Sequence, residues 1–243
     1  MKGRDADRIY GHACALARAL ERVGDRWTLL VVRDLMLGPK RFTDLMELLA
    51  GITPKSLTQR LRDLEADGLV EVDRVAGRRD VWYRLSPAGK DLQPALDELL
   101  RWGMRHAFEP PRPDEPVHVE HVLRALQSQL QREGVDAGSV RWTMHAPRTD
   151  SYSLIGDGPR WELRIDQGSE ALPDVTITAT RSALVRFLTT PPPRSLHPDD
   201  VEISGKPAAV RAFLKAIEVF PPVAAEHPSQ LSAASASAST AEK

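Results

Sequence analysis

Three polar side chains near residue 60 have types and a spacing suited to contacting the edges of DNA bases. Lys55, Gln59 and Arg62 follow one another at i, i+4 and i+7, so an α-helix would place them on one face. Lys and Arg can donate hydrogen bonds to O6 and N7 of guanine, and Gln can pair with adenine. The opposite face of the same helix would carry the apolar side chains Leu57, Leu61 and Leu64. This pattern predicts that the leucine face is buried.

Other polar residues extend this predicted face. Ser56 and Thr58 lie alongside it, and the segment 52–62 contains three basic residues and no acidic one. The basic tip of a predicted hairpin, at 75–80, is suited to reach the flanking phosphates or the minor groove. The complete set of candidate DNA-binding residues is Lys55, Ser56, Thr58, Gln59, Arg60, Arg62, Arg78 and Arg79. The alternative interpretation is a solvated amphipathic helix beside an ordinary hairpin.

The surrounding sequence predicts a small, mostly helical domain that positions this helix. Thr53 offers a capping hydroxyl and Pro54 suits the first helical position, so the helix runs from Thr53 to about Asp67, where Gly68 ends it. Apolar spacing predicts further helices near 16–23, 27–37, 42–49 and 86–106. In the last of these, Pro94 predicts a kink or a late start. Alternating residues predict the two strands of the hairpin at 69–74 and 81–85.

Four stretches of this region resemble one known family in their residues and their order. They read CALARALERVGDRWTLL (14–30), LGPKRFTDL (37–45), GITPKSLTQRLRDLEADGL (51–69) and YRLSPAG (83–89). Over about residues 12–106 the chain resembles the HxlR-type winged helix-turn-helix regulators. The resemblance implies that the helix 53–67 enters the major groove and that the hairpin is the wing. It also implies that terminal helices form a homodimer, which reads paired half-sites.

A stripe of apolar residues on the last predicted helix of this domain also favours dimerisation. Leu92, Leu96, Leu99 and Trp102 form a stripe larger than a small domain needs to cover at its edge. We expect this stripe to form a homodimer interface, which would place two recognition helices on two half-sites. The alternative is that the stripe packs against the first helix of its own domain.

Length and charge predict two domains with different partners. The chain has 243 residues, 42% of them hydrophobic and 28% charged, which fits one or two ordinary globular domains. We predict a winged-helix domain, a Pro-rich linker, a second domain and a disordered tail at 1–108, 109–116, 117–221 and 222–243. The first 106 residues carry 19 Lys and Arg against 16 Asp and Glu, whereas the rest carry 14 against 18. The first half therefore favours polyanions and the second does not.

The second predicted domain has an α+β pattern. A helix at 117–133 precedes alternating strands at 140–145, 161–166 and 175–179, a helix near 182–188, a short strand at 201–204 and a helix near 207–220. The segments DVTITATRSALVRFL (174–188) and DVEISGKPAAVRAFL (200–214) resemble the C-terminal part of sterol carrier protein type domains. The expected fold class is therefore α+β: an N-terminal winged helix-turn-helix domain plus a C-terminal sterol-carrier-protein-like α+β domain.

The second resemblance implies a cavity for a lipid or another apolar ligand between sheet and helices. The candidate ligand-binding residues are Trp142, Met144, Leu154, Trp161, Leu163 and Phe187. In a regulator, a ligand in this cavity would be an effector. The alternative is that these side chains fill the core, because a packed core and an apolar pocket use the same residue types.

The single cysteine, Cys14, excludes an internal disulfide and is a redox candidate. Many HxlR-type proteins carry an N-terminal cysteine here, and in some of them it senses oxidants or electrophiles. A sensing thiol needs exposure and a lowered pKa, to which a nearby cation such as Arg18 could contribute. We favour the alternative that Cys14 is inert, since a free cysteine is usually a small buried hydrophobe.

Several other function classes are not expected. No stretch is long and apolar enough to span a membrane, and the N-terminus lacks the apolar run of a signal peptide, so we expect a cytoplasmic protein. The sequence has no Gly-rich phosphate loop and no Gly-x-Ser-x-Gly motif, so we expect no enzyme, no catalytic residues and no cofactor. His118 and His121 are close in sequence, but two ligands do not make a zinc site, so no metal is expected.

Two hypotheses follow from these patterns. The leading one is a sequence-specific regulator of transcription, a repressor that binds double-stranded DNA as a homodimer and is modulated by an apolar ligand. The rival is a carrier or binding module for lipids or other apolar ligands, in which the winged domain mediates protein contacts.

Overall fold

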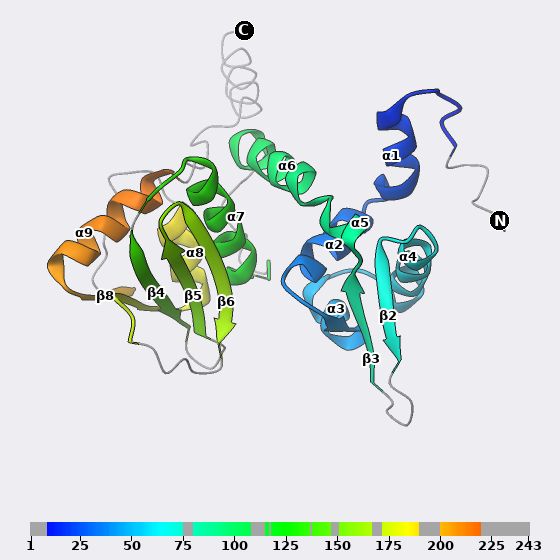
Figure 1. Cartoon of the computed structure of the whole chain (residues 1–243). Coiled ribbons are helices and arrows are strands. Elements are labelled where there is room, and N and C mark those ends of the chain that lie inside the picture. The colour runs from blue at the N-terminus through cyan, green and yellow to red at the C-terminus, as the bar shows by residue number, and fades with distance from the viewer. Residues whose placement is uncertain are drawn as a thin grey trace, which may run out of the picture. The chain divides into compact units, whose positions relative to one another are not determined.

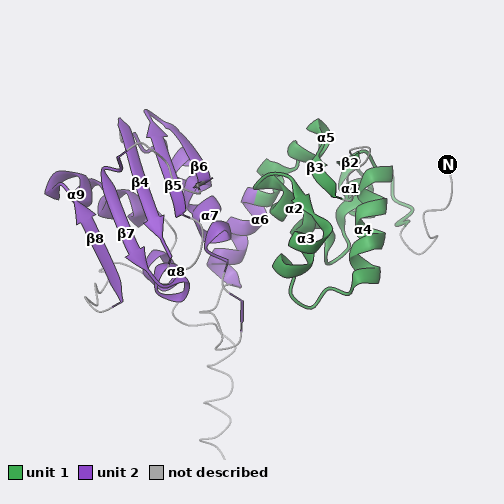
Figure 2. Ribbon diagram, turned by 90° about the horizontal axis from the view of Figure 1, so that it is seen from below, with its two compact units in different colours: residues 1–96 green, residues 97–243 purple. Residues whose placement is uncertain are grey.

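The computed structural model describes residues 9–74, 80–107, 115–116, 118–136, 138–146, 151–166, 172–189 and 200–219 (Figure 1). The chain forms two compact units, residues 1–96 and 97–243 (Figure 2). The division falls within helix α6 (Gln93–His106). Most of the predicted linker 109–116 and all of the predicted tail 222–243 lie outside the described residues. The predicted domain limits therefore stay a prediction.

Unit 1 consists of short helices and a small antiparallel sheet. Its helices are α1 (Ala15–Val23), α2 (Thr28–Met36), α3 (Phe42–Leu48), α4 (Pro54–Ala66), α5 (Pro87–Lys90) and the beginning of α6. Its described strands are β1 (Lys40–Arg41), β2 (Val70–Arg74) and β3 (Val81–Leu85), which pair in the order β1-β3-β2. The predicted helices and the predicted hairpin are confirmed. The two-residue strand β1 was not predicted.

The predicted last helix of this region is split into α5 and α6. Ser86 caps α5, because its Oγ accepts a hydrogen bond of 3.0 Å from the N–H of Gly89 and donates one of 2.6 Å to the carbonyl of Gly68. A Cβ at Gly89 would lie 2.1 Å from the carbonyl oxygen of Leu69, so this close approach requires glycine. Helix α6 then begins at Gln93, with Pro94 in its first turn, which confirms the predicted late start.

The core of unit 1 is built around α2. Val31 and Val32 of this helix are fully buried, as its dense apolar pattern predicts. They belong to one hydrophobic cluster with buried side chains of α3, α4 and the hairpin. Leu92 and Leu96 pack against the same cluster. The hairpin and the helix-turn-helix segment are therefore anchored to a common core.

Unit 2 is a mixed sheet with helices on one face, so the predicted α+β class is confirmed. Its further helices are α7 (Val119–Arg132), α8 (Arg181–Thr189), α9 (Pro207–Ala216) and the 3-10 turn η2 (Ile217–Val219). Its described strands are β4 (Ser139–His145), β5 (Ser151–Asp157), β6 (Arg160–Asp166), β7 (Val175–Ala179) and β8 (Val201–Gly205). They lie in the order β6-β5-β4-β7-β8 (Figure 2). Strands β4 and β7 are parallel, and the other neighbours are antiparallel.

Side chains from one face of this sheet and from α7, α8 and α9 form the core of unit 2. The strand β5, which lies between β4 and β6, was not predicted, although it supplies Tyr152 and Leu154 to the core. At the edge of the core, Nε1 of Trp161 donates a hydrogen bond to the carbonyl of Val135 over 2.8 Å. The likeness to sterol carrier domains stays a prediction. Among the described helices, none combines the length and the apolar character that crossing a membrane requires.

A matched pair of leucines tests this description of unit 2. Leu154 is fully buried, whereas Leu172 is 92% exposed. We expect Leu154→Ala to lower the free energy of unfolding by about 2–5 kcal/mol, because it leaves a cavity in the core. Leu172→Ala should change it by less than about 0.5 kcal/mol. Urea unfolding of both variants measures the difference, and equal effects would contradict the burial of Leu154 within β5.

Candidate nucleic-acid interface

The helix α4 begins at a well-formed cap. The Oγ1 of Thr53 accepts a hydrogen bond of 3.1 Å from the N–H of Ser56, and it donates one of 2.8 Å to the Oγ of the same residue. Pro54 follows at the first helical position, where its missing N–H costs no hydrogen bond. The turn that leads from α3 into this cap contains Gly51 at φ +87° and the buried Ile52. The helix-turn-helix segment is therefore fixed at both the turn and the cap.

Burial on one side of α4 determines which residues face outward. Leu57, Leu61 and Leu64 are all buried in the core of unit 1, so the predicted leucine face is confirmed. The side chains of Lys55, Gln59 and Arg62 are exposed, and those of Ser56 and Thr58 are half-buried beside them. This face therefore combines two cations with an amide and two hydroxyl groups.

Hydrogen bonds within α4 orient several of these polar groups. The Oγ1 of Thr58 donates to the carbonyl of Pro54 over 2.8 Å. The Nε2 of Gln59 donates to Oδ1 of Asp63, also over 2.8 Å. The amide of Gln59 is consequently oriented before any DNA is bound.

Arg60 differs from the other candidates, and its assignment to the DNA-binding face is corrected by its burial. The residue is 7% exposed, and its guanidinium lies 2.9 Å from Oδ2 of Asp63 and 3.5 Å from Oδ2 of Asp25. It stands three positions after Leu57, so it lies about 60° from that residue, on the side of α4 that faces the core. Arg60 therefore joins α4 to the corner between α1 and α2.

Two acidic partners of this arginine were not predicted. Asp63 follows Gln59 by four residues and Arg60 by three, a helical spacing that could have indicated both contacts. Asp25 is distant in sequence, and no local pattern signals its contact. Its Oδ1 accepts the N–H of Trp27 over 3.0 Å, so the same carboxylate also binds the backbone just before α2.

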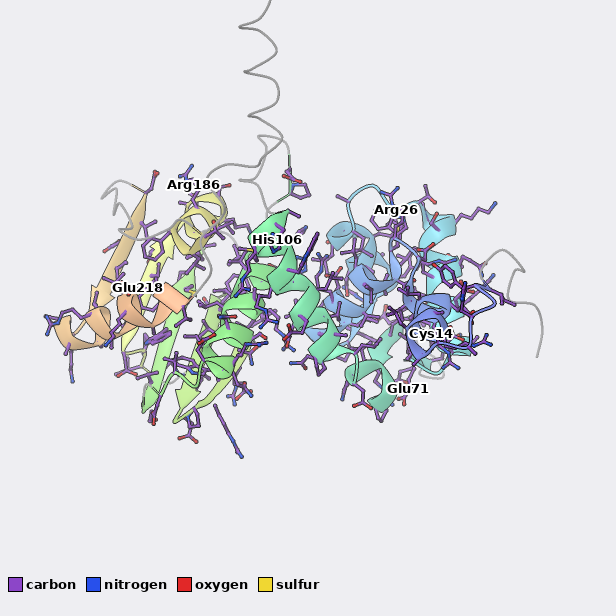
Figure 3. The ribbon with its side chains drawn as sticks, turned by 90° about the horizontal axis from the view of Figure 1, so that it is seen from above. Cys14, Arg26, Glu71, His106, Arg186 and Glu218 are labelled. Carbon is purple, nitrogen blue, oxygen red and sulfur yellow. The ribbon has the colours of Figure 1, made fainter. Side chains whose placement is uncertain are left out.

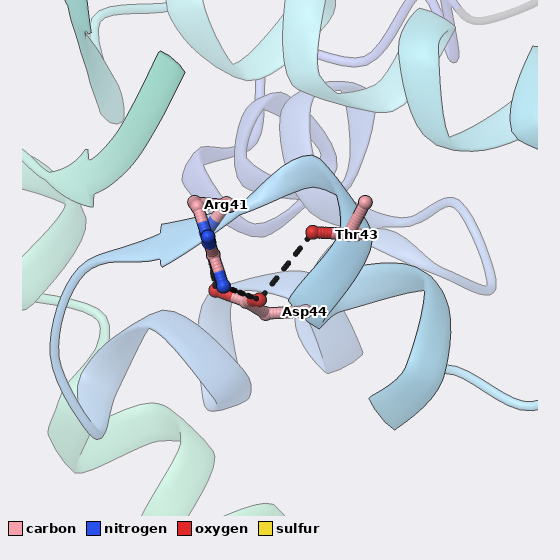
Figure 4. A network of polar contacts seen from close by, with 3 residues as sticks. All are labelled: Arg41, Thr43 and Asp44. Carbon is pink, nitrogen blue, oxygen red and sulfur yellow. Dashed lines mark hydrogen bonds and ion pairs between the residues drawn. The ribbon is translucent and has the colours of Figure 1, made fainter. Parts of the chain in front are cut away.

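The first helix of the motif, α3, has a polar network of its own at its N-terminus (Figure 4). The backbone N–H of Arg41 donates to Oδ2 of Asp44 over 2.8 Å, and its guanidinium lies 3.3 Å from Oδ1. Partial burial acts to raise the pKa of Asp44, but the hydrogen bonds and the charge from Arg41 outweigh it and lower that pKa. The Arg41 guanidinium also lies over the Trp82 ring, so it connects α3 to the hairpin strand β3.

The hairpin forms as predicted, but its tip is not described. Strands β2 and β3 pair from Val70 with Leu85 to Arg74 with Val81. The candidate residues Arg78 and Arg79 lie outside the described residues.

Cys14 lies at the N-cap of α1 (Figure 3) and is exposed, so the expectation of a buried thiol is wrong. Its pKa is lowered by hydrogen bonds from the backbone of Ala17 and then of Leu16. The predicted helper Arg18 instead pairs with Glu21 over 3.1 Å. The exposure and the direction of the shift suit a sensing thiol, and Cys14 stays a redox candidate.

The apolar stripe on the last helices of the winged domain is divided by burial. Leu92 and Leu96 are half-buried and pack against the core of unit 1. Leu99 and Trp102 are 51% and 58% exposed. The exposed part of the stripe therefore consists of Leu99 and Trp102.

The six candidate ligand-binding residues of unit 2 come together in one cluster. Five are buried, and Leu163 packs half-buried against them. The rings of Trp142 and Trp161 lie 4.6 Å apart, and Phe213, which was not among the candidates, lies 5.1 Å from Trp142. These ring contacts are typical of a packed core. Within the described part of the chain, no three His, Cys, Asp or Glu residues are arranged to hold a metal ion.

The different surroundings of Arg60 and Arg62 generate a stability prediction. Arg60→Ala should lower the free energy of unfolding by about 1–3 kcal/mol, because it removes the shared partner of Asp25 and Asp63. Arg62→Ala removes an exposed side chain of the same type and should change it by less than about 0.5 kcal/mol. Urea unfolding compares the two. A larger loss for Arg62→Ala would contradict the geometry above.

Comparison with known proteins places unit 1 among transcriptional regulators. The HxlR-like helix-turn-helix family model matches residues 22–110. The HTH-type regulator Mb3122 of Mycobacterium bovis is 43% identical over 110 residues, which are 44% of this chain and 66% of that protein. For YtcD of Bacillus subtilis the identity is 40% over 90 residues, or 36% of this chain and 70% of that protein. For YkvN of the same organism it is 39% over 98 residues, or 39% and 81%.

Solved structures of similar proteins cover the same share of the chain. A putative MarR-family regulator from Enterococcus faecalis is 39% identical, covers 37% of this chain and 82% of its own, and gives a TM-score of 0.35. Reduced YodB from Bacillus subtilis is 33% identical, covers 38% and 92%, and also gives 0.35. These scores are low, and the assignment depends on the sequence matches. The chain spans about two thirds of the length of the mycobacterial relative and more of the two from Bacillus, and it belongs to the HxlR-like helix-turn-helix family.

Proposed function

We propose that this protein is a DNA-binding regulator of transcription whose helix α4 reads bases in the major groove. The observation that carries the proposal is the exposed face of Lys55, Gln59 and Arg62, opposite a buried leucine face. An α-helix fits the major groove, and these side chains can bind base edges there. The relatives named above, which are HTH-type transcriptional regulators, support the same function.

The hairpin β2–β3 is the wing in this proposal. Its tip, with Arg78 and Arg79, contacts phosphates or the minor groove beside the base-reading helix. Phosphate contacts add affinity without sequence information, whereas the contacts of α4 supply the specificity. The two elements therefore contribute differently to binding.

A substitution on the exposed face tests the proposal. The DNA for this test is a duplex that the unchanged protein selects from a random pool. Arg62→Ala should weaken binding to this duplex by about 1–3 kcal/mol and relax the preference at one base pair, if Arg62 contacts a guanine. A uniform loss on every sequence would instead make Arg62 a phosphate contact. The control Arg160→Ala removes the same charge from an exposed position in unit 2 and should leave binding unchanged.

The salt dependence of DNA binding separates this function from the rival hypothesis of a carrier or binding module for lipids or other apolar ligands. Each phosphate contact should lower log K by about 0.9 for each tenfold rise in salt. Duplexes selected from a random pool, titrated at several salt concentrations, give this slope. Binding that is weak, independent of salt and the same for all duplexes would favour the carrier hypothesis, in which the winged domain mediates protein contacts.

We further propose that the regulator acts as a homodimer and represses. The exposed Leu99 and Trp102 are apolar side chains suited to an interface between two copies, which would place two α4 helices on paired half-sites. A dimer that covers both half-sites excludes other proteins from the same DNA, and this exclusion is the physical basis for repression.

Light scattering at micromolar concentration tests the interface. The unchanged protein should be a dimer, and Leu99→Glu should give a monomer because it introduces a charge into an apolar contact. Leu172→Glu is the matched control, since it changes an exposed leucine outside the proposed interface. A monomer without any substitution would remove the dimer from this proposal.

A second proposal concerns unit 2, which we infer to be sterol-carrier-like and to bind an apolar effector that tunes DNA affinity. The observation that favours it is the gathering of Trp142, Met144, Trp161 and Phe187 between the sheet and the helices. Flexible and aromatic side chains of this kind line most small-molecule sites. Thermal stabilisation by a panel of lipid-like compounds checks the proposal, and no shift with any of them would leave these residues as core.

A further inference from the structure

On the exposed face of α4, a neighbouring carboxylate holds the amide of Gln59 in one orientation. The Nε2 of Gln59 donates a hydrogen bond of 2.8 Å to Oδ1 of Asp63, one helical turn further along. An ionised carboxylate accepts hydrogen bonds and donates none, so the NH2 end of the amide must face Asp63. The amide oxygen Oε1 of Gln59 therefore turns away from that carboxylate.

Asp63 is itself fixed from the side of the core. Its other oxygen, Oδ2, lies 2.9 Å from Nη2 of the buried Arg60. Nη1 of Arg60 lies 3.5 Å from Oδ2 of Asp25, whose Oδ1 accepts the N–H of Trp27. The two oxygens of Asp63 thus have different partners, a buried guanidinium and the amide of Gln59.

We propose that Asp63 is a positioning residue that determines which base Gln59 recognises, an inference that rests on the DNA binding proposed for α4. With Oε1 turned outward and the second N–H of the amide still available, Gln59 matches a base that offers a donor beside an acceptor. Adenine offers this pair in the major groove through N6 and N7, whereas guanine offers the acceptors N7 and O6. Asp63 therefore favours adenine over guanine opposite Gln59, without touching the DNA.

The substitution Asp63→Asn should reverse this preference. Arg60 only donates hydrogen bonds, so the oxygen of the new amide faces Arg60 and its NH2 group faces Gln59. Gln59 accepts from that group when its own Oε1 turns toward it, and its Nε2 then points outward. A side chain that presents N–H groups matches the acceptors of guanine.

The experiment selects duplexes from a random pool with the full-length chain and then compares duplexes that differ at one base pair. At the position read by Gln59, the unchanged protein should prefer adenine over guanine by at least about fivefold. Asp63→Asn should prefer guanine at the same position. Gln59→Ala identifies the position, because it should remove the preference in both backgrounds.

A matched control separates orientation from charge. Glu65→Gln removes one negative charge from an exposed position of the same helix, as Asp63→Asn does from its own position. It should strengthen binding to all duplexes alike and leave the base preference unchanged. If Glu65→Gln also changed the preference from adenine to guanine, the change would be due to the lost charge, and the role of Asp63 would be overturned.

The outcomes distinguish this inference from the function on which it rests. If the unchanged protein selects no sequence, the proposed function fails. If it selects one but prefers guanine at the position that Gln59→Ala identifies, the inference fails and DNA binding stands, even where Asp63→Asn does not fold. An adenine preference that persists in a folded Asp63→Asn variant also overturns the role of Asp63.

Discussion

The burial of one face of α4 is the constraint on which the rest of the interface depends. Leu57, Leu61 and Leu64 each gain about 1.5–3 kcal/mol from leaving water. Rotating the helix by one residue, about 100°, would expose these leucines and bury polar side chains in their place. The rotation of α4 about its axis is therefore fixed by apolar packing. The polar face is presented as a consequence of this packing and needs no binding partner to form.

The signals that form α4 lie within the helix itself, so the helix could be predicted from the sequence. The contact of Arg60 with Asp25 could not, because it joins residues that are far apart along the chain. The cap at Thr53, the proline at the first position and the leucine spacing all act within one helix, so they are visible in the sequence. Arg60 looked like its exposed neighbour Arg62, because its burial depends on Asp25, which is far away along the chain. Residue types alone therefore place a core residue, Arg60, on the predicted binding face.

The same distinction applies to the sheet of unit 2. Strand β5 has the alternating pattern of a strand, with Tyr152 and Leu154 buried, but Ile155 lies on the other face and Gly156 follows it, so the pattern is weak. Its place between β4 and β6 is set by pairing along its whole length. Sequence also cannot separate a pocket from a core, because side chains such as Trp142 and Trp161 are typical of both.

The choice of arginine at position 60 connects the stability of unit 1 to the geometry of its binding face. A planar guanidinium has N–H groups on different edges, so it can bind the carboxylates of Asp25 and Asp63 together, whereas a lysine ammonium is a single point charge. One of these carboxylates binds the backbone before α2, and the other orients Gln59. A change in the corner between α1 and α2 can therefore reach the amide of Gln59 through two side chains.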